Sequence, residues 1–182
     1  MPEYIAFLRA INVGGHNVKM DDLRSLFESL GFTNVETFIA SGNVIFASKS
    51  KNTKALEKKI EEHLQQSLGY EVKTFIRTFG EIAAIAQYQA FSEAALKSAI
   101  ALNVGFLAEP LNEDSRAVLM SFTTDIDNFH HHGREIYWLC RMKQSDSSFS
   151  NVAFERKLKV KATFRGLNTI KRLAAKYPTS DL

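Results

Sequence analysis

The chain has 182 residues, of which 45% are hydrophobic and 24% charged, and a formal net charge of +3 at pH 7. This composition is ordinary for a globular protein and argues against intrinsic disorder. A lone cysteine, Cys140, excludes an internal disulfide, and no uninterrupted apolar run approaches the roughly 18 residues needed to span a bilayer. The opening residues, Met1-Pro2-Glu3, lack the basic stretch and apolar core of a secretory signal, so we expect a cytoplasmic protein.

Charge is distributed unevenly along the sequence. Residues 156–182 hold eight Lys and Arg and one acidic residue, whereas residues 1–155 hold 15 basic and 19 acidic side chains. A basic end on an acidic body is typical either of a nucleic-acid-binding face or of an intramolecular partner for the acidic part. If nucleic acid is the partner, the candidate phosphate contacts are Lys161, Arg165, Lys171 and Arg172.

The first predicted element is a strand over residues 3–11, followed by a glycine-containing loop over residues 12–19. Both alternating faces of the strand are largely apolar, which is typical of a central strand covered on both sides. Apolar residues at helical spacing between Leu23 and Leu30 then predict a helix, and Gly31 supplies its left-handed end.

A hairpin and a second helix follow. Two β-rich runs, residues 35–40 and 44–48, are joined through Ser41-Gly42-Asn43, where Gly-Asn suits a type II′ turn. The second helix ends at Gly69 and places four aliphatic side chains on one stripe: Leu56, Ile60, Leu64 and Leu68. Residues 72–77 form the fourth strand.

The order to this point is the ferredoxin-like one, and the second half of the chain repeats it. Thr78 and Glu81 match the capping box that begins a third helix. The second half then reads as a strand over 100–108, a helix capped by Asn112, a hairpin around His132-Gly133-Arg134, a helix capped by Ser150, a strand over 160–165 and a last helix. We therefore predict an α+β fold of two ferredoxin-like β-α-β-β-α-β subdomains in pseudo-repeat, residues 1–90 and 91–182, each followed by a helix.

Five motifs stand out in this order along the chain: Leu8-Arg9-Ala10-Ile11-Asn12-Val13-Gly14-Gly15, Ser41-Gly42-Asn43-Val44, Phe106-Leu107-Ala108-Glu109-Pro110, Gly133-Arg134-Glu135 with Tyr137-Trp138, and Ala162-Thr163 with Arg165 and Asn168-Thr169. Together they resemble the bacterial domain-of-unknown-function family numbered 1697 over essentially the whole chain. The resemblance implies a mostly bacterial, soluble α+β protein with ferredoxin-like subdomains, and it implies no activity.

Two positions depart from the pattern of that family. Its first motif usually has a glycine where this chain has Ala10, and its last motif usually has Asn-Trp where this chain has Gly166-Leu167. If that aromatic ring stacks on a ligand elsewhere in the family, this chain lacks the platform.

The loop after the first strand is the leading candidate for a binding site. A strand, a glycine-rich loop and a helix N-terminus offer backbone N–H groups and a positive dipole end to an anion. In the ferredoxin-like order the end of the first strand and the hairpin turn share one edge of the sheet, so the two are predicted neighbours. The candidate contacts to a small phosphate-bearing ligand are Arg9, Asn12, Gly14, Gly15, Lys19, Ser41, Gly42 and Asn43. Alternatively, the glycines serve a tight loop and Arg9 pairs with a carboxylate across the sheet.

Other reactive groups give weaker signals. Alternation places only two of the histidines at 130–132 on one face, which is too few for a metal site, so we predict no metal and no cofactor. Cys140 falls in an apolar strand and is predicted to be a buried small hydrophobe rather than a nucleophile. Asp125 and Asp127 are predicted to be solvated.

Three hypotheses about function follow. The first is binding of a small anionic ligand at the edge formed by residues 12–19 and 41–43, with catalysis left open. The second is binding of the nucleic-acid backbone through the basic segment 156–176, although Val44-Ile45-Phe46-Ala47 does not match an RNP-type sequence. The third is a protein-interaction module without a small ligand.

Overall fold

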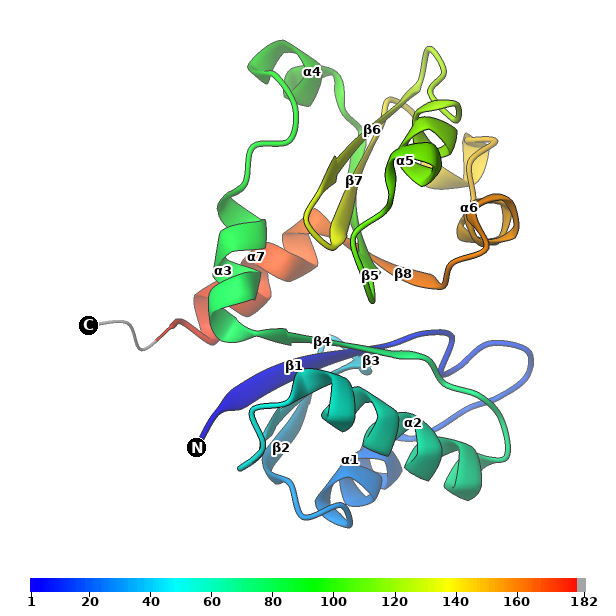
Figure 1. Ribbon diagram of the computed structural model, residues 1–182. Coiled ribbons are helices and arrows are strands. Elements are labelled where there is room, and N and C mark those ends of the chain that lie inside the picture. Colours follow the sequence, from blue (N-terminus) through cyan, green and yellow to red (C-terminus); the bar gives the residue numbers. More distant parts are fainter. Residues whose placement is uncertain (180–182) are drawn as a thin grey trace. The chain divides into compact units, whose positions relative to one another are not determined.

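The computed structural model describes residues 1–179, without the side chain of Ser41. The described chain folds into two compact units, one made of residues 1–84 together with residues 173–179, and the other made of residues 85–172. In each unit, helices lie on one face of a four-stranded sheet (Figure 1). Among the residues described, no helix is both long and apolar enough to cross a membrane.

The first unit has the predicted β-α-β-β-α-β order. Its elements are β1 (Glu3–Leu8), α1 (Met20–Glu28), β2 (Thr33–Phe38), β3 (Ala40–Ala47), α2 (Thr53–Leu68) and β4 (Thr74–Thr78). The strand order is β2-β3-β1-β4 and every neighbouring pair is antiparallel, which is the ferredoxin-like arrangement.

β1 is one of the two inner strands of this sheet, and both of its faces are covered as its apolar alternation predicts. Tyr4, Ala6 and Leu8 pack into a core with side chains of α1, α2 and β3. On the other face, Ile5 and Phe7 are fully buried.

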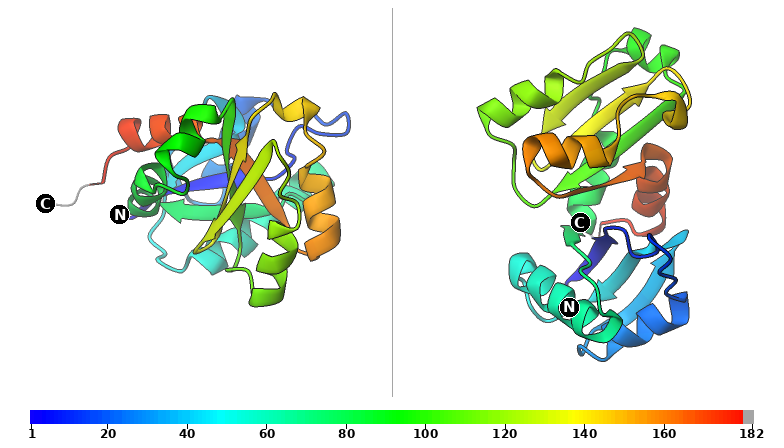
Figure 2. Two further views of the ribbon diagram at one scale, coloured as in Figure 1. Left: turned by 90° about the horizontal axis from the view of Figure 1, so that it is seen from above. Right: turned by 90° about the vertical axis from the view of Figure 1, so that its right-hand side faces the viewer.

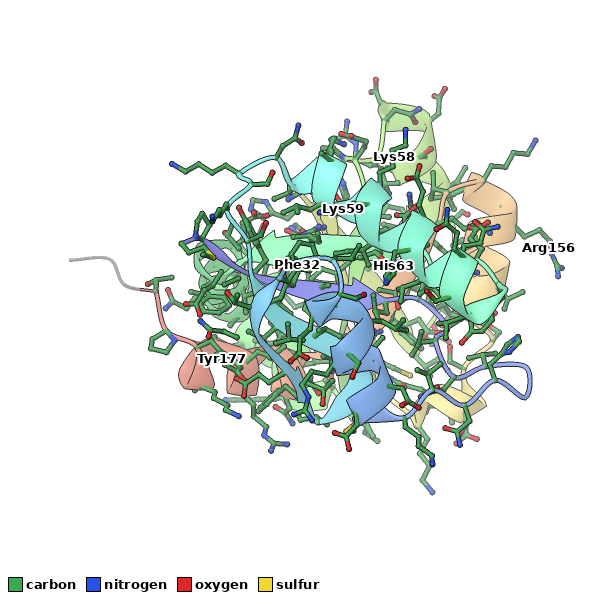
Figure 3. The ribbon with its side chains drawn as sticks, turned by 90° about the horizontal axis from the view of Figure 1, so that it is seen from below. Phe32, Lys58, Lys59, His63, Arg156 and Tyr177 are labelled. Atoms are coloured by element: carbon green, nitrogen blue, oxygen red, sulfur yellow. The ribbon has the colours of Figure 1, made fainter. Side chains whose placement is uncertain are left out.

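In the helical layer of the first unit, side chains of α2 contact the segment that follows α1. Lys59 on α2 donates a hydrogen bond to the Leu30 carbonyl at 3.2 Å, and its Nζ lies 5.5 Å from the centre of the Phe32 ring. His63, one turn further along α2, is hydrogen-bonded to the Ser29 hydroxyl at 2.8 Å (Figure 3).

The predicted turn of the first hairpin is wrong. β3 already begins at Ala40, so Ser41-Gly42-Asn43 lies in the strand, and the reversal occurs at Ile39, which has φ 66°. Two interactions draw Asn43 into the sheet: its backbone pairs with Phe7 of β1, and its side-chain amide donates to the Phe38 carbonyl at 3.1 Å.

The predicted end of the second helix at Gly69 is confirmed, because Gly69 ends α2 in the left-handed conformation. At the start of α2, Asn52 acts as the N-cap by accepting a hydrogen bond from the Ala55 N–H. α3 (Phe79–Gln87) begins with the capping box, in which Glu81 N–H donates to Thr78 Oγ1 and Thr78 N–H donates to Glu81 Oε1. α3 spans the boundary between the two units at residue 84.

The second unit repeats the topology. Its elements are α4 (Glu93–Ser98), β5 (Ala101–Leu107), α5 (Glu113–Met120), β6 (Asp127–His132), β7 (Glu135–Cys140), the 3₁₀ turn η1 (Gln144–Asp146), α6 (Asn151–Leu158), β8 (Ala162–Gly166) and α7 (Leu167–Lys176), which spans the second boundary at residue 172. The antiparallel order β6-β7-β5-β8 matches that of the first sheet. α5 and α6 cover one face of this sheet, and α4 lies on the other side (Figures 1 and 2).

A buried carboxylate corrects the prediction of a solvated Asp127. Asp127 is fully buried because three donors from separate parts of the chain satisfy its carboxylate. They are the indole N–H of Trp138 at 2.9 Å, the Thr124 hydroxyl at 3.0 Å and the Ser147 hydroxyl at 2.8 Å. The network ties the polar segment after β7 to the sheet, next to an aromatic core in which the Phe149 ring lies 4.8 Å from that of Trp138.

We predict that Gly105→Ala destabilises the second unit. A Cβ at this buried β5 position would lie 2.6 Å from the Phe164 ring, so the ring must move within a packed aromatic core. Overpacking of this kind costs about 1–3 kcal/mol, which urea unfolding would measure.

Gly166→Ala is the matched control. A Cβ at Gly166 meets nothing within 4 Å, so this change should stay within about 0.5 kcal/mol of wild type. In a Phe164→Leu background the cost of Gly105→Ala should fall, and equal stability of Gly105→Ala and wild type would refute the packing argument.

Candidate functional site

The loop predicted to bind an anion is held by contacts within its own unit. The Asn12 side chain accepts a hydrogen bond from the Val18 N–H at 2.8 Å. Tyr70 donates to the Ile11 carbonyl at 2.7 Å, and its ring stacks on His16 at 3.7 Å between centroids. The loop is therefore an ordered, exposed projection at one edge of the first sheet (Figure 1).

The other predicted contacts lie at the same edge, but several of them are buried or hydrogen-bonded within the first unit. Asn43 pairs with Phe7 near the end of β1, as the strand order predicts, yet Asn43 and Gly42 are buried within β3. The side chain of Ser41 lies outside the described part of the structure. Arg9 is partly buried and its N–H donates to the Lys73 carbonyl at 2.9 Å. The exposed part of the predicted site is thus Asn12 to Lys19.

Left-handed backbone gathers at this edge. Gly14 and Gly15 have φ of 70° and 84°, which glycine adopts without steric cost. Ala10 (φ 54°) and Ile39 (φ 66°) adopt the same region at a cost of about 1–2 kcal/mol each, because the Cβ approaches the backbone. The glycine usual at position 10 in the resembled family therefore suits a left-handed position, which alanine occupies here under strain.

The four basic candidates for nucleic-acid binding differ in their exposure and in their hydrogen bonds. Lys161, Lys171 and Arg172 are exposed. Arg165 instead donates from Nη1 to the Thr163 hydroxyl and the Phe164 carbonyl, both at 2.8 Å, and burial lowers its pKa to about 10. Arg165 is thus engaged with acceptors of its own strand.

A cavity in the second unit escaped prediction from the sequence. It has a volume of about 410 Å³ and lies among the segment from Ala86 to Phe91, α4, β5, β7 and the start of α7. Its larger side chains are aromatic, aliphatic, amide and charged: Tyr88, Phe91 and Tyr137; Leu96, Leu102 and Leu167; Gln87 and Gln89; Glu93 and Lys171. These residues come from a predicted junction and from separate elements, so no short motif marks them.

Tyr88 is held in the cavity wall by two histidines of β6. Its hydroxyl is hydrogen-bonded to His130 Nε2 at 2.8 Å, and its ring stacks on His132 with centroids 4.0 Å apart. Burial, and to a lesser extent the charge of His132, lowers the pKa of His130, which favours the neutral imidazole. Beside it, the Tyr137 hydroxyl donates to the Ile85 carbonyl, and burial raises the pKa of this phenol.

Asn103 also lines the cavity, but its side chain is a poor ligand contact. Because side chains alternate along β5, the Asn103 side chain lies on the opposite face of the sheet from that of Leu102. That opposite face also carries Trp138, the partner of Asn103 on β7. Its amide nitrogen is buried there without a hydrogen-bond partner among the described residues. The amide and charged side chains left to meet a ligand are therefore those of Gln87, Gln89, Glu93 and Lys171.

Comparison with known proteins places the chain in a family. The model of the protein family of unknown function DUF1697 matches residues 1–137. The chain belongs to DUF1697. The match covers the first sheet and extends into β7 of the second, so the DUF1697 pattern includes most of the elements around the cavity.

A solved structure has the same fold as this DUF1697 chain. The conserved bacterial protein SP0830 from Streptococcus pneumoniae is similar with a TM-score of 0.73 and 23% sequence identity, over 96% of this chain and 97% of that one. At this identity the similarity shows the fold alone. No curated protein matches the sequence.

Two other groups considered from the sequence are now placed. Cys140 is buried in β7, and burial raises the pKa of its thiol, which disfavours the nucleophilic thiolate. Across residues 1–179, no group of three or more His, Cys, Asp and Glu side chains is arranged to hold a metal ion.

We predict that protonation of His131 lowers the free energy of unfolding at mildly acidic pH. Its Nε2 accepts a hydrogen bond from the Leu111 N–H at 3.2 Å, so protonation at this atom removes the acceptor. Burial first, and then the nearby Arg116 charge, lowers the pKa of His131, against a smaller opposing effect from the Gly133 backbone. The unfolded chain binds the proton near pH 6.5, so stability is complete above that pH and falls between it and the lower native pKa.

Urea unfolding at pH 7.5 and at pH 5.5 would measure this loss. His131→Gln keeps a side-chain acceptor that does not titrate, so the variant should lose less stability than wild type between the two pH values. Equal losses in the two proteins would contradict the assignment, and comparable stability at pH 7.5 would show that Gln replaces the hydrogen bond.

Proposed function

We propose that this DUF1697 protein binds a small organic ligand in the cavity of its second unit. The observation that supports the proposal is the cavity itself, whose volume of about 410 Å³ falls in the range of roughly 300–1,000 Å³ typical of small-molecule sites. Like such sites, it combines apolar walls with a few polar groups.

The walls suit a flat or branched apolar group. Tyr88, Phe91 and Tyr137 offer ring faces and edges, and ring pairs of this kind contribute about 0.5–1.5 kcal/mol beyond simple burial. Leu96, Leu102 and Leu167 add aliphatic surface to the lining. Because His130 and His132 already hold Tyr88, part of the wall is organised before a ligand arrives.

We expect Leu102→Trp to fill the cavity and abolish ligand binding. Ligand-observed NMR with a panel of monocyclic aromatic fragments should detect binding to wild type and not to this variant. Val152→Trp is the control, because Val152 is 65% exposed on α6 of the same unit and does not line the cavity. Fragments that bind Leu102→Trp as well as wild type would exclude the cavity as the site.

A second candidate is a small anionic, phosphate-bearing ligand at the edge formed by residues 12–19 and 41–43. It is supported by the start of α1, where Lys19 at the N-cap makes no side-chain capping bond, and by the left-handed Gly14 and Gly15 beside it. Backbone N–H groups at such a helix start suit an anion, and Arg9 would add charge.

Inorganic pyrophosphate tests this second candidate. At 100 times its dissociation constant it should stabilise the protein by about 2.7 kcal/mol, seen as a higher melting temperature. Arg9→Ala should remove this increase, whereas Arg24→Ala should keep it, because Arg24 pairs with Asp21 on the exposed side of α1. A pyrophosphate effect that survives in Arg9→Ala would rule out this edge.

Nucleic-acid binding stays a prediction, now resting on Lys161, Lys171 and Arg172 more than on Arg165. It would appear as affinity that falls steeply with salt. A protein-interaction role and a cytoplasmic location also stay proposals.

A further inference from the structure

We infer that the ligand of the second-unit cavity is a zwitterion of the α-amino acid class with an aromatic side chain, an inference that rests on the proposed function. The inference comes from the two charged side chains that line this cavity. Glu93 and Lys171 have opposite charges and come from different elements, the first residue of α4 and the middle of α7.

Neither charge is paired with an opposite charge among the described residues. Within the part of the chain that the structure describes, neither Glu93 nor Lys171 takes part in an ion pair, so they do not neutralise each other across the cavity. Both are exposed, which makes each a modest contributor, since exposed ion pairs are typically worth up to about 1 kcal/mol. Discrimination among ligands therefore depends on satisfying both at once.

Ligands with one charge meet one favourable and one unfavourable group. A simple carboxylate is attracted by Lys171 and repelled by Glu93, and a simple amine has the opposite problem. A zwitterion can present its carboxylate to Lys171 and its ammonium to Glu93. Its apolar side chain is then left for the ring-lined wall of Tyr88, Phe91 and Tyr137.

The Tyr and Phe rings favour an aromatic side chain over a small aliphatic one. Tyr88 and Tyr137 lie 5.3 Å apart between centroids at an angle of 42°, a tilted rather than stacked pair, and one face of Tyr88 is covered by His132. A third ring can join this aromatic group in the face-to-edge arrangement that aromatic groups prefer.

Three probes that share a phenyl ring and differ in their charged groups test the inference. They are L-phenylalanine, 3-phenylpropionate, which lacks the ammonium, and 2-phenylethylamine, which lacks the carboxylate. Titration calorimetry or ligand-observed NMR should give phenylalanine about threefold to fivefold tighter binding than either analogue, a difference of about 0.6–1 kcal/mol. Lys171→Gln should remove the preference over phenylethylamine, and Glu93→Gln the preference over phenylpropionate.

Matched controls separate these effects from a general change of charge. Lys97→Gln and Glu113→Gln alter exposed residues of the same unit that do not line the cavity, so both variants should retain the wild-type order of affinities. If either control changes the order as strongly as Lys171→Gln or Glu93→Gln, the assignment of the two charges is wrong.

The ligand class and the site can fail separately. If phenylpropionate or phenylethylamine binds as tightly as phenylalanine, or if none of the three binds while aromatic fragments still do, the zwitterion inference is overturned and the cavity remains the site. If fragment binding is unaffected by Leu102→Trp, the proposed function itself is overturned.

Discussion

The insertion of the first strand of each unit between two antiparallel partners is the constraint on which the fold depends. β1 lies between β3 and β4, and β5 lies between β7 and β8, so neither strand has an open edge, and most residues of both strands are buried. This position requires apolar residues on both faces and allows a glycine only where a neighbour fills its space. Gly105 beneath the Phe164 ring is that case, and the ring in turn joins the aromatic core around Phe149.

Most of the fold could be predicted because its signals are local, and the errors occur where distant residues decide. Alternation marks β1, and Asn52, Gly69 and the Thr78–Glu81 box mark helix ends through contacts a few residues long. The predicted position of the first hairpin turn is wrong because Asn43 belongs to β3, where it pairs with Phe7 of another strand. The burial of Asp127 is not marked in the sequence, because its donors include Trp138 on the next strand, β7, and Ser147 beyond that strand.

The same distinction separates the two candidate sites. Asn12 to Lys19 is continuous in sequence, so its glycines and its place at the edge of the sheet could be recognised without a structure. The cavity is assembled from side chains between Ala86 and Lys171 that share no motif. Its two charged residues, Glu93 and Lys171, lie far apart in the sequence, near opposite ends of the second unit. Residue 10 shows what the structure adds even to a recognised motif, because the left-handed φ of Ala10 gives a steric reason for the glycine usual in the family.

The setting of Trp138 has a spectroscopic consequence. It is the one tryptophan of the chain, and it is buried in the second unit with its indole N–H on the Asp127 carboxylate and its ring against Phe149. Its fluorescence emission therefore reports the loosening of this core, while the first unit is silent at that wavelength. Compared with a signal from the whole backbone, the emission can show whether the two units unfold as one cooperative body or in succession.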